Sequence, residues 1–577
     1  MNGGAQIAQV LHARGVREIF TLCGGHISPI LVEAKRLGIR VTDVRDEATA
    51  VFAADAYARL TGIPGVAAVT AGPGLTNTIT AVKNAQLAQS PLLILGGAAA
   101  TALKGRGALQ DIEQMPLMSP HVKFARAVKR VRDLAPAVAD ALTAARAGVP
   151  GPVFVECPVD LLYDQETVRK WYAQSAPRGL SPGALAARLN LNRHLRRLFA
   201  GVGEPPEPEP APVAEPPGHK TIQAFVRRIG RARRPLMICG SQLVARTDRI
   251  DRVRDAIALL NIPVYLSGMA RGLLGAEHRL LLRHRRRDAI DEADMVILAG
   301  VPCDFRLDYG AQIRRGTKLV SINLDKRDLK LNRKPHLAIN ADPGATLIAL
   351  ADGIEPGAAD RPDWRAELSA RDSERGGNID RRARAIPPEG GVNPLHLLCT
   401  LDRMLEDDSV LVADGGDFVA TASYTVRPRG PLRWLDPGRF GTLGVGGGFA
   451  LGAARARPSG QVWILYGDGS LGYSLIEFDT YARHGLAPIA IVGNDASWAQ
   501  IEREQVRLLG DDVGVTLART DYHLAAEGLG GKGLVIRSND EVEAVIGQAK
   551  ELAWQGHPVL VNVYLAETDF REGSLSI

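Results

Sequence analysis

The chain has 577 residues, too many for one hydrophobic core, and its 46% hydrophobic and 23% charged residues are typical of a soluble globular protein with three or four domains. The formal net charge of +6 is small for this length, and because no nucleic-acid-binding motif accompanies it we expect no nucleic-acid partner. The longest apolar runs are far shorter than the roughly 20 residues that span a bilayer, so we expect no membrane association.

Cysteine usage and the start of the chain bear on the cellular compartment. The five cysteines are dispersed and lack metal-ligand spacing, and Met1 to Gln9 carries no secretory signal. We therefore expect reduced thiols and a cytoplasmic protein. The one dense basic run, Arg279 to Arg287, leaves two interpretations open: a solvated helix or loop face, or an anion site such as one for a nucleotide phosphate.

Residues 1–165 alternate short apolar runs with helical patterns. A helix is expected at Glu47–Arg59, and the strands are expected at Ile19–Leu22, Val66–Thr70, Leu92–Leu95 and Val153–Val155. Strands that alternate with helices indicate a parallel, doubly wound sheet. Residues 166–219 break the pattern, and we expect a Pro- and Glu-rich linker over this segment. Within it, Gly203 to Gly218 is so rich in Pro and Glu that we expect it to be exposed, without a helix or central strand.

Two further α/β patterns follow, at residues 220–355 and 390–567. The second domain's strands are expected at Leu236–Cys239, Val264–Leu266, Met295–Ala299 and Leu319–Ile322. The third domain's are expected at Val410–Ala413, Val462–Tyr466, Ile489–Val492 and Val559–Val563. Residues 356–389 form a charged connector, and the polar tail at 568–577 is expected to be mobile. The predicted fold class is α/β, with three doubly wound parallel-sheet domains.

The strongest motif lies in the third domain, where a predicted strand runs into Gly467-Asp468-Gly469 and the next predicted strand ends at Gly493-Asn494. Adjacent parallel strands end at one edge of a sheet, where α/β folds bind ligands. Asp468 and Asn494 would each place an oxygen ligand there, which suits Mg²⁺ and a bound phosphate. Gly469 and Ser470 would open a helix whose free N–H groups face that phosphate.

This arrangement resembles the thiamine diphosphate (ThDP) fingerprint, in which Asn follows Gly-Asp-Gly after some two dozen residues; here 470–493 intervene. In that family the carbonyl two residues past the Asn completes the metal shell, which implies Ala496. The resemblance also implies cofactor contacts from Gly467, from Tyr473 and from the loop that contains Gly416, Asp417 and Phe418.

A second match lies in the first domain, where Val44 to Arg59 resembles the family helix that carries the activating Glu. Glu47 falls on the position that hydrogen-bonds the aminopyrimidine and promotes deprotonation of the cofactor, and Asp46 replaces the His usual in acetolactate synthases. Phe440 to Gly446 resembles the loop beneath the cofactor, and Leu443 falls on the residue that enforces the bent conformer of ThDP.

Together these matches resemble the acetolactate-synthase superfamily over nearly the whole chain. The resemblance implies pyrimidine-binding, central nucleotide-binding-like and diphosphate-binding domains, with active sites across the interface of a homodimer or homotetramer. The central domain would hold FAD, ADP or the ADP portion of CoA. Arg271 and Arg306 would meet phosphates there and Asp325 a ribose, although each residue taken alone is more typical of an ordinary surface or ion-pair residue.

Within the superfamily, the chain is most similar to the 2-hydroxyacyl-CoA lyases at Phe20–Pro29, Ala81–Gln86, Gly430–Pro437 and Gly472–Asp479. Those enzymes cleave a 2-hydroxyacyl-CoA to formyl-CoA and an aldehyde or ketone one carbon shorter, or run in reverse. His26, in a glycine loop after a strand, has a pKa suited to moving the proton of the substrate hydroxyl, although a structural role is also open. Gln110 matches a family Gln that faces the substrate, or supports its loop.

Two alternatives stay open at this point. The chain could be an acetolactate synthase or another ThDP-dependent 2-oxo-acid decarboxylase. It could also be a non-catalytic relative, which the presence of Glu47, Asp468 and Asn494 disfavours. For a CoA ester we expect the tail at 568–577 to close over the bound substrate.

Overall fold

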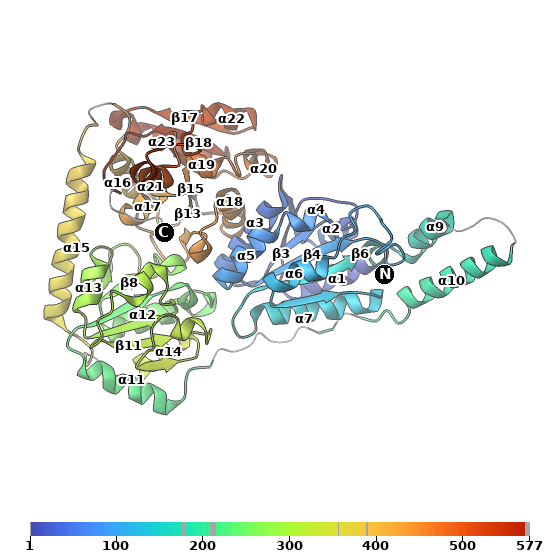
Figure 1. The fold of residues 1–577 in the computed structure, drawn as a ribbon, viewed down its shortest axis with the longest axis horizontal. Helices are drawn as coiled ribbons and strands as arrows, with labels where there is room; N and C mark the ends of the chain where they lie inside the picture. The colour runs from blue at the N-terminus through green and yellow to red at the C-terminus, as the bar shows by residue number, and fades with distance from the viewer. Residues whose placement is uncertain are drawn as a thin grey trace. The chain divides into compact units, whose positions relative to one another are not determined.

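The computed structural model describes residues 2–175, 181–204, 206–207, 215–355, 357–387 and 390–571. It divides into two compact units. Unit 1 contains Met1–Pro212 with Arg439–Thr442, and unit 2 contains Val213–Gly438 with Leu443–Ile577. Unit 1 holds one six-stranded parallel sheet and unit 2 holds two, which confirms the predicted fold of three doubly wound α/β domains (Figure 1).

The sheet of unit 1 has the strand order β2-β1-β3-β4-β6-β5. Its strands are β1 (Glu18–Thr21), β2 (Arg40–Asp43), β3 (Gly65–Val69), β4 (Leu92–Ala98), β5 (Phe124–Ala127) and β6 (Pro152–Pro158). The four predicted strands are confirmed as β1, β3, β4 and β6, and all four are buried along their length. Apolar runs of this kind are typical of strands with helices on both faces.

The helices of unit 1 cover this sheet. They are α1 (Gly3–Ala13), α2 (Ser28–Arg36), α3 (Glu47–Thr61), α4 (Pro73–Thr76), α5 (Ile79–Ala88), α6 (Gln114–Met118), α7 (Leu134–Arg146) and α8 (Val159–Leu162). The predicted helix at Glu47–Arg59 is confirmed as α3. It is buried over most of its length, because small alanines let it approach the sheet closely.

The segment expected as a linker contains two helices that were not predicted, α9 (Gln165–Ser175) and α10 (Pro182–Phe199). They project from the rest of unit 1 (Figure 1). Ser181 caps α10, and Leu198 near its end packs into the core of unit 1. The described residues between 203 and 218 contain no helix or strand, as expected, and the other residues of that stretch lie outside the described part of the chain.

The first sheet of unit 2 has the order β12-β11-β10-β7-β8-β9. Its strands are β7 (Pro235–Cys239), β8 (Val264–Leu266), β9 (Leu281–Leu282), β10 (Met295–Ala299), β11 (Lys318–Ile322) and β12 (Leu337–Ile339), and the four predicted ones are confirmed. Its helices are α11 (His219–Arg231), α12 (Ile250–Leu260), α13 (Arg286–Glu292) and α14 (Pro343–Asp352). Counted from β7, the order is that of dinucleotide-binding folds.

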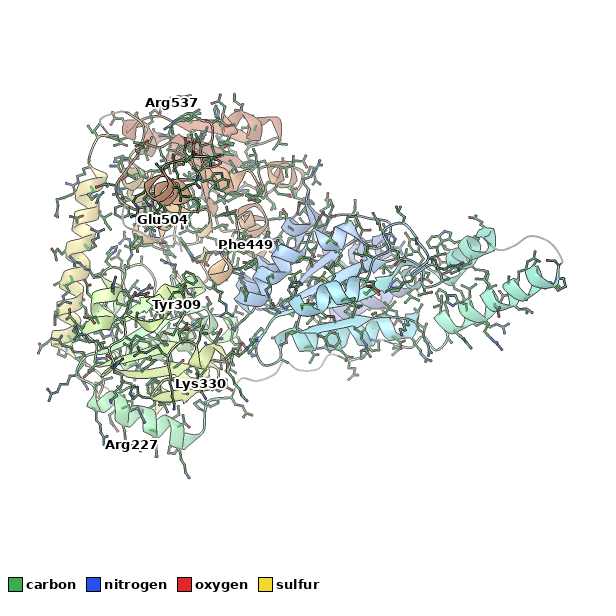
Figure 2. All side chains as sticks on the ribbon, in the orientation of Figure 1. Arg227, Tyr309, Lys330, Phe449, Glu504 and Arg537 are labelled. Carbon is green, nitrogen blue, oxygen red and sulfur yellow. The ribbon has the colours of Figure 1, made fainter. Side chains whose placement is uncertain are left out.

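The second sheet of unit 2 has the order β14-β13-β15-β16-β18-β17. Its strands are β13 (Val410–Asp414), β14 (Trp434–Leu435), β15 (Val462–Gly467), β16 (Ile489–Asn494), β17 (Lys532–Ile536) and β18 (Val559–Tyr564), and again the four predicted ones are confirmed. Its helices are α16 (Pro394–Met404), α17 (Asp417–Thr425), α18 (Val445–Ala456), α19 (Asp468–Leu471), α20 (Glu477–Arg483), α21 (Ala499–Leu509), α22 (Tyr522–Gly528) and α23 (Val542–Trp554). Side chains fill the space between these layers, among them the fully buried Phe449 of α18 (Figure 2).

The charged connector forms a 22-residue helix, α15 (Pro362–Ala383), which runs along unit 2 past both of its sheets (Figure 1). Phe570, near the start of the tail, packs against Ile379 and Ala383 of this helix. Residues 572–577, the larger part of the tail predicted to be mobile, lie outside the described residues. In the described part of the chain, no helix combines the length and the apolar character needed to cross a membrane.

Candidate active site

Asp468 and Asn494 lie side by side at the carboxyl edge of the second sheet of unit 2. The register of β15 and β16 pairs Gly467 with Gly493. Asp468 and Asn494 each come one residue after this pair, so they lie at the same height along the two strands. Asp468 is 2% exposed, and its two carboxylate oxygens accept the N–H groups of Gly469 at 2.8 Å and Ala496 at 2.9 Å. Burial raises the pKa of Asp468 to about 6, because no cation among the described residues pairs with it.

The amide of Asn494 is oriented so that its oxygen is free. Its Nδ2 donates to Oδ1 of Asn562 and to the carbonyl of Thr520, both at 3.1 Å. Its Oδ1 is buried and accepts no hydrogen bond within the described residues. A buried acceptor without a donor is costly unless something else fills it. A hard cation beside Asp468 would do so, and the two side chains therefore fit a Mg²⁺ ion.

Ala496 has a φ of 60°, a conformation that non-glycine residues adopt rarely and mostly at functional sites. Its carbonyl accepts the N–H of Leu517 at 2.7 Å, which leaves one lone pair for a metal. No cluster of three or more His, Cys, Asp or Glu side chains that could hold a metal occurs in the described ranges. The candidate centre thus offers few protein ligands, as expected where a diphosphate supplies the others.

Asp414, at the end of β13, connects the loops around this centre. It is fully buried, and its carboxylate accepts the N–H groups of Gly444 at 3.1 Å and Gly446 at 2.7 Å. Burial raises its pKa to about 7. Its carbonyl lies 2.5 Å from the hydroxyl of Ser470, in the Gly-Asp-Gly turn. Asp414 therefore fixes the backbone directly after Leu443, the residue expected beneath the cofactor.

The other predicted cofactor contacts have different surroundings. A Cβ on Gly416 would approach the side-chain oxygen of Gln500 to 2.8 Å, and a Cβ on Gly444, which has a φ of 86°, would approach Cβ of Tyr473 to 2.9 Å. Asp417 opens α17 and pairs with Arg503 at 3.2 Å. Phe418 packs in the core, with its ring against Gly493, so only its backbone is open to a ligand.

The predicted site residues of unit 1 follow strands, at the carboxyl edge of its sheet. Glu47 is 7% exposed and is the first residue of α3, where Asp46 caps the helix through the N–H of Ala48. His26 follows β1, and its Nδ1 lies 3.1 Å from the hydroxyl of Thr70. Burial lowers the pKa of His26, which favours the neutral imidazole that a proton acceptor requires.

Gln110 follows β4 and has a φ of 62°. A Cβ on Gly72, which itself has a φ of 61°, would approach the carbonyl of Gln110 to 2.8 Å. This close approach holds the Gln110 loop against the glycine loop after β3. Gln110, a non-glycine residue in the left-handed region, is typical of a functional site, whereas Gly72 adopts its positive φ without strain.

The three nucleotide candidates of the central sheet differ from one another. Arg306 pairs with Asp304 at 2.7 Å, and Asp325 pairs with the exposed Arg327 at 3.2 Å. Arg271 instead donates to the carbonyl of Ser423 and lies over the ring of Trp434. It lines a cavity of about 430 Å³ within unit 2, together with Arg283, Arg285, Arg286, Arg287 and Arg427.

Some residues of the site were not singled out from the sequence. Asn562 and Thr520 orient Asn494, and Asn77 donates to Glu47 at 3.0 Å. Asn77 carries one usable signal, because it follows the Gly72-Pro73-Gly74 turn after a buried strand. Asn562 carries none, since a lone Asn in an apolar run gives no indication of its neighbours across the sheet.

Comparison with known proteins agrees with this geometry. Three sequence families match, described as the N-terminal TPP-binding, central and C-terminal TPP-binding domains of thiamine pyrophosphate enzymes, at residues 1–117, 222–350 and 414–563. Similar relatives include 2-hydroxyacyl-CoA lyase 2 of Homo sapiens, 50% identical over 100% of this chain and 92% of the relative, and that of Danio rerio, 51% identical over 100% and 93%. The acetolactate synthase large subunit IlvG of Mycobacterium tuberculosis is 35% identical over 98% and 95%. The chain belongs to the thiamine pyrophosphate (ThDP) enzyme family.

Proposed function

We propose that this chain is a ThDP- and Mg²⁺-dependent 2-hydroxyacyl-CoA lyase. It cleaves a 2-hydroxyacyl-CoA between the carbonyl carbon and the hydroxyl-bearing carbon, giving formyl-CoA and an aldehyde or ketone one carbon shorter, and it catalyses the reverse condensation. The observation that carries the proposal is the full-length similarity, at about half of all positions, to relatives named 2-hydroxyacyl-CoA lyase 2.

The proposed roles follow from the surroundings of each side chain. Bound ThDP would supply a nucleophilic carbon for the thioester carbonyl of the substrate and an electron sink for the bond that is cleaved. Asp468, Asn494 and the carbonyl of Ala496 hold Mg²⁺ against the diphosphate. Glu47 hydrogen-bonds the aminopyrimidine, and His26, neutral in its buried loop, accepts the proton of the substrate hydroxyl. Gln110 orients the substrate oxygen.

The cavity of unit 2 favours a CoA ester over a small free acid. The guanidinium groups of Arg271, Arg283 and Arg286 donate to the backbone carbonyls of Ser423 at 3.0 Å, Tyr424 at 2.7 Å and Arg306 at 2.6 Å, and no carboxylate among the described residues accepts a hydrogen bond from these groups. Burial lowers the pKa of all three guanidinium groups. Charges held in this way are stabilised by an incoming anion, and CoA brings several phosphate charges.

The proposed active site takes residues from two copies of the chain. Glu47 belongs to unit 1 and the metal ligands to unit 2, and in the family the two come from different subunits. We therefore propose a homodimer or homotetramer. Helix α21, which begins shortly after Ala496, has no buried residue and exposes Leu508 and Leu509. Such an apolar surface is expected where another subunit covers it.

The test is incubation of the protein with ThDP, Mg²⁺ and a 2-hydroxyacyl-CoA, with mass-spectrometric detection of formyl-CoA and the shortened aldehyde. A parallel reaction with pyruvate measures acetolactate. Formyl-CoA without acetolactate supports the lyase, whereas acetolactate alone would replace it with the acetolactate-synthase alternative.

The arginine cavity is tested separately. Arg283→Ala and Arg286→Ala should raise KM for the CoA ester about tenfold each, as expected for the loss of a charge-assisted hydrogen bond. Arg279→Ala is the matched control, because Arg279 belongs to the same basic run but is exposed and does not line the cavity. Equal KM values in all three variants would remove the cavity from substrate binding.

A further inference from the structure

The carboxylate of Glu47 is held from one side only. Its Oε2 accepts a hydrogen bond from Nδ2 of Asn77 at 3.0 Å. Within the described residues Oε1 accepts no hydrogen bond, and no Lys, Arg or His forms an ion pair with Glu47. The other charged side chains of α3, Asp55 and Arg59, pair with each other further along the helix. Arg45 and Asp46 flank Glu47 in the chain, and Asp46 is engaged in capping.

The backbone around Asn77 is fixed by buried contacts. Asn77 is the residue after α4, and its own N–H donates to the carbonyl of Pro73 at 3.0 Å. The N–H of Gly72, just before α4, donates to Oε1 of Gln114 at 3.1 Å. Gln114 is 2% exposed, and its Nε2 donates to the carbonyl of Gly97 at 3.0 Å and to Glu156 at 3.1 Å. Asn77 itself is exposed, and the turn that carries it is anchored at Gly72 by the buried Gln114.

The space beside the free oxygen is kept open by a glycine. A Cβ on Gly74 would lie 3.4 Å from Oε1 of Glu47 and would clash with Thr70 at 2.6 Å. One carboxylate oxygen is thus tied to a neutral amide, and the other faces a surface without a side chain. The choice of an amide matters, because a cation at the same place would hold Glu47 ionised and prevent it from sharing a proton.

We propose that Asn77 is a positioning residue, which holds Oε2 of Glu47 and presents Oε1 to the aminopyrimidine of ThDP. This proposal rests on the role proposed for Glu47, and it adds a residue whose contribution is geometric. Asn77 itself does not contact the reacting atoms.

The first experiment measures hydrogen–deuterium exchange at the thiazolium C2 of bound ThDP by acid quench and proton NMR, on the full-length holoenzyme without substrate. Asn77→Ala should slow the exchange about tenfold or more, as expected for the loss of a hydrogen bond to a charged group. Asn77→Asp has the same shape and should slow it at least as much, because it replaces the donor by a second acceptor.

Thr76→Ala is the matched control. Thr76 is the last residue of the short helix that Asn77 follows, its exposed hydroxyl donates to the carbonyl of Pro73, and it forms no hydrogen bond with Glu47. The exchange rate of this variant should stay within about twofold of the unmodified protein, as for most changes at exposed positions. An equal loss in Thr76→Ala would show that loop stability, not the amide, sets the rate, and would overturn the proposal.

The double variant Glu47→Gln/Asn77→Ala separates this proposal from the one on which it rests. If Asn77 acts through Glu47, the double variant should exchange no more slowly than Glu47→Gln alone. Additive losses would overturn the positioning role. An unchanged rate in Glu47→Gln would instead overturn the proposed activation by Glu47. Neither result depends on whether a CoA ester is the substrate.

A second readout uses the protein without cofactor. Infrared difference spectroscopy, with Glu47→Gln as the reference, isolates the carboxyl bands of Glu47. Asn77→Ala should shift these bands, because Oε2 loses the amide donor from which it accepts a hydrogen bond. Thr76→Ala should leave the bands unchanged. Bands unaffected by Asn77→Ala would place the two side chains out of contact and overturn the proposal.

Discussion

The sheet of unit 1 and the second sheet of unit 2 have the same strand order but present different chemistry. Matched strand by strand, β1, β2, β3 and β4 correspond to β13, β14, β15 and β16. The strand ends and following segments of the first set carry His26, Glu47, Asn77 and Gln110, for which we propose proton transfer or the positioning of groups that take part in it. Those of the second set carry Asp417, Leu443, Asp468 and Asn494, which we propose shape the cofactor site or supply oxygen ligands to the metal.

The difference teaches that the sheet fixes where a loop begins, and the loop decides what it does. The comparison also implies a division of labour between the two sheets. Changes at the second sheet of unit 2 should weaken cofactor binding, whereas changes in unit 1 should spare binding and impair proton transfer. Each prediction below tests one side of that division.

The largest effect is expected for Asp468→Ala. Loss of this ligand should weaken binding of Mg²⁺ and ThDP by more than about 100-fold, beyond the loss typical of an outer-shell residue. Titration calorimetry with both ligands measures it. The cofactor-free variant should melt no lower than the unmodified protein, because the change removes a carboxylate that burial disfavours. Unchanged affinity would place the metal elsewhere.

Glu47→Gln should give the opposite pattern. Gln keeps the shape of the side chain and one acceptor, so the Kd for ThDP should change by less than about threefold, as for a substitution that keeps its hydrogen bond. Turnover should fall by about 10²–10⁴, the range for loss of a proton-transfer group. Steady-state kinetics beside calorimetry gives both values. A variant with normal turnover would remove Glu47 from the mechanism and break the comparison.

Asn562→Leu should have a smaller effect on the same side as Asp468→Ala. Leu has a similar volume but cannot accept from Nδ2 of Asn494, so the free oxygen is less well oriented. The contact with Thr520 remains, and Mg²⁺ affinity should fall about tenfold, at the lower end for an outer-shell change. Metal titration at saturating ThDP measures this. Tighter Mg²⁺ binding would contradict the assignment of the Asn494 oxygen as a ligand.

The mildest effect is a pH dependence of opposite sign with and without cofactor. Asp468, Asp414 and Asp495 have pKa values raised by burial to about 6, about 7 and about 7. Because these values exceed those of the unfolded chain, the folded protein without cofactor binds more protons, and its stability falls as pH rises through about 6 to 7. Thermal melts from pH 5 to 8 test this, and a melting temperature rising throughout would contradict it.

Metal binding should show the reverse trend. Asp468 must lose its proton to act as a ligand, so affinity for Mg²⁺ and ThDP should fall about tenfold per unit below pH 6. Asp468→Asn is the control, since its residual binding should lack this steep decline. The same decline in both would assign it to another group.

The strands that could be predicted from the sequence are the central ones. All four central strands of each sheet appear as apolar runs, because helices cover both of their faces. The six edge strands were not predicted: β2 and β5, β9 and β12, β14 and β17. β9 and β14 have two residues each, and β2 has a single buried residue, so none of these three gives a continuous apolar signal.

Helices away from the sheets were harder still. α15 appears in the sequence as a run of charges, and only Trp364, Leu368, Ile379 and Ala383 mark its buried face. α10 lies in residues 166–219, and we predicted a linker over this whole segment from the Pro- and Glu-rich composition of its second half. Both predictions relied on amino-acid composition, whereas the helical spacing of the apolar residues was the signal that indicated each helix.

Site residues divide in a similar way. Asp468, Asn494 and Glu47 could be predicted because each follows a strand within a recognisable local motif. The partners that orient two of them, Asn562 and Asn77, are 68 and 30 residues distant along the chain. Such contacts depend on strand pairing and loop packing, which a single sequence does not record.

The pairing of Gly467 with Gly493 has a consequence for how this family varies. What a metal at the proposed site would require is a shared register at the ends of β15 and β16, not a fixed number of residues between them. An insertion at Gly485, in the exposed turn before β16, would leave both ligands in place. One residue inserted within either strand would turn its ligand to the opposite face of the sheet. The number of residues between Asp468 and Asn494 can therefore vary without loss of the proposed metal site, provided that the change lies in the turn before β16.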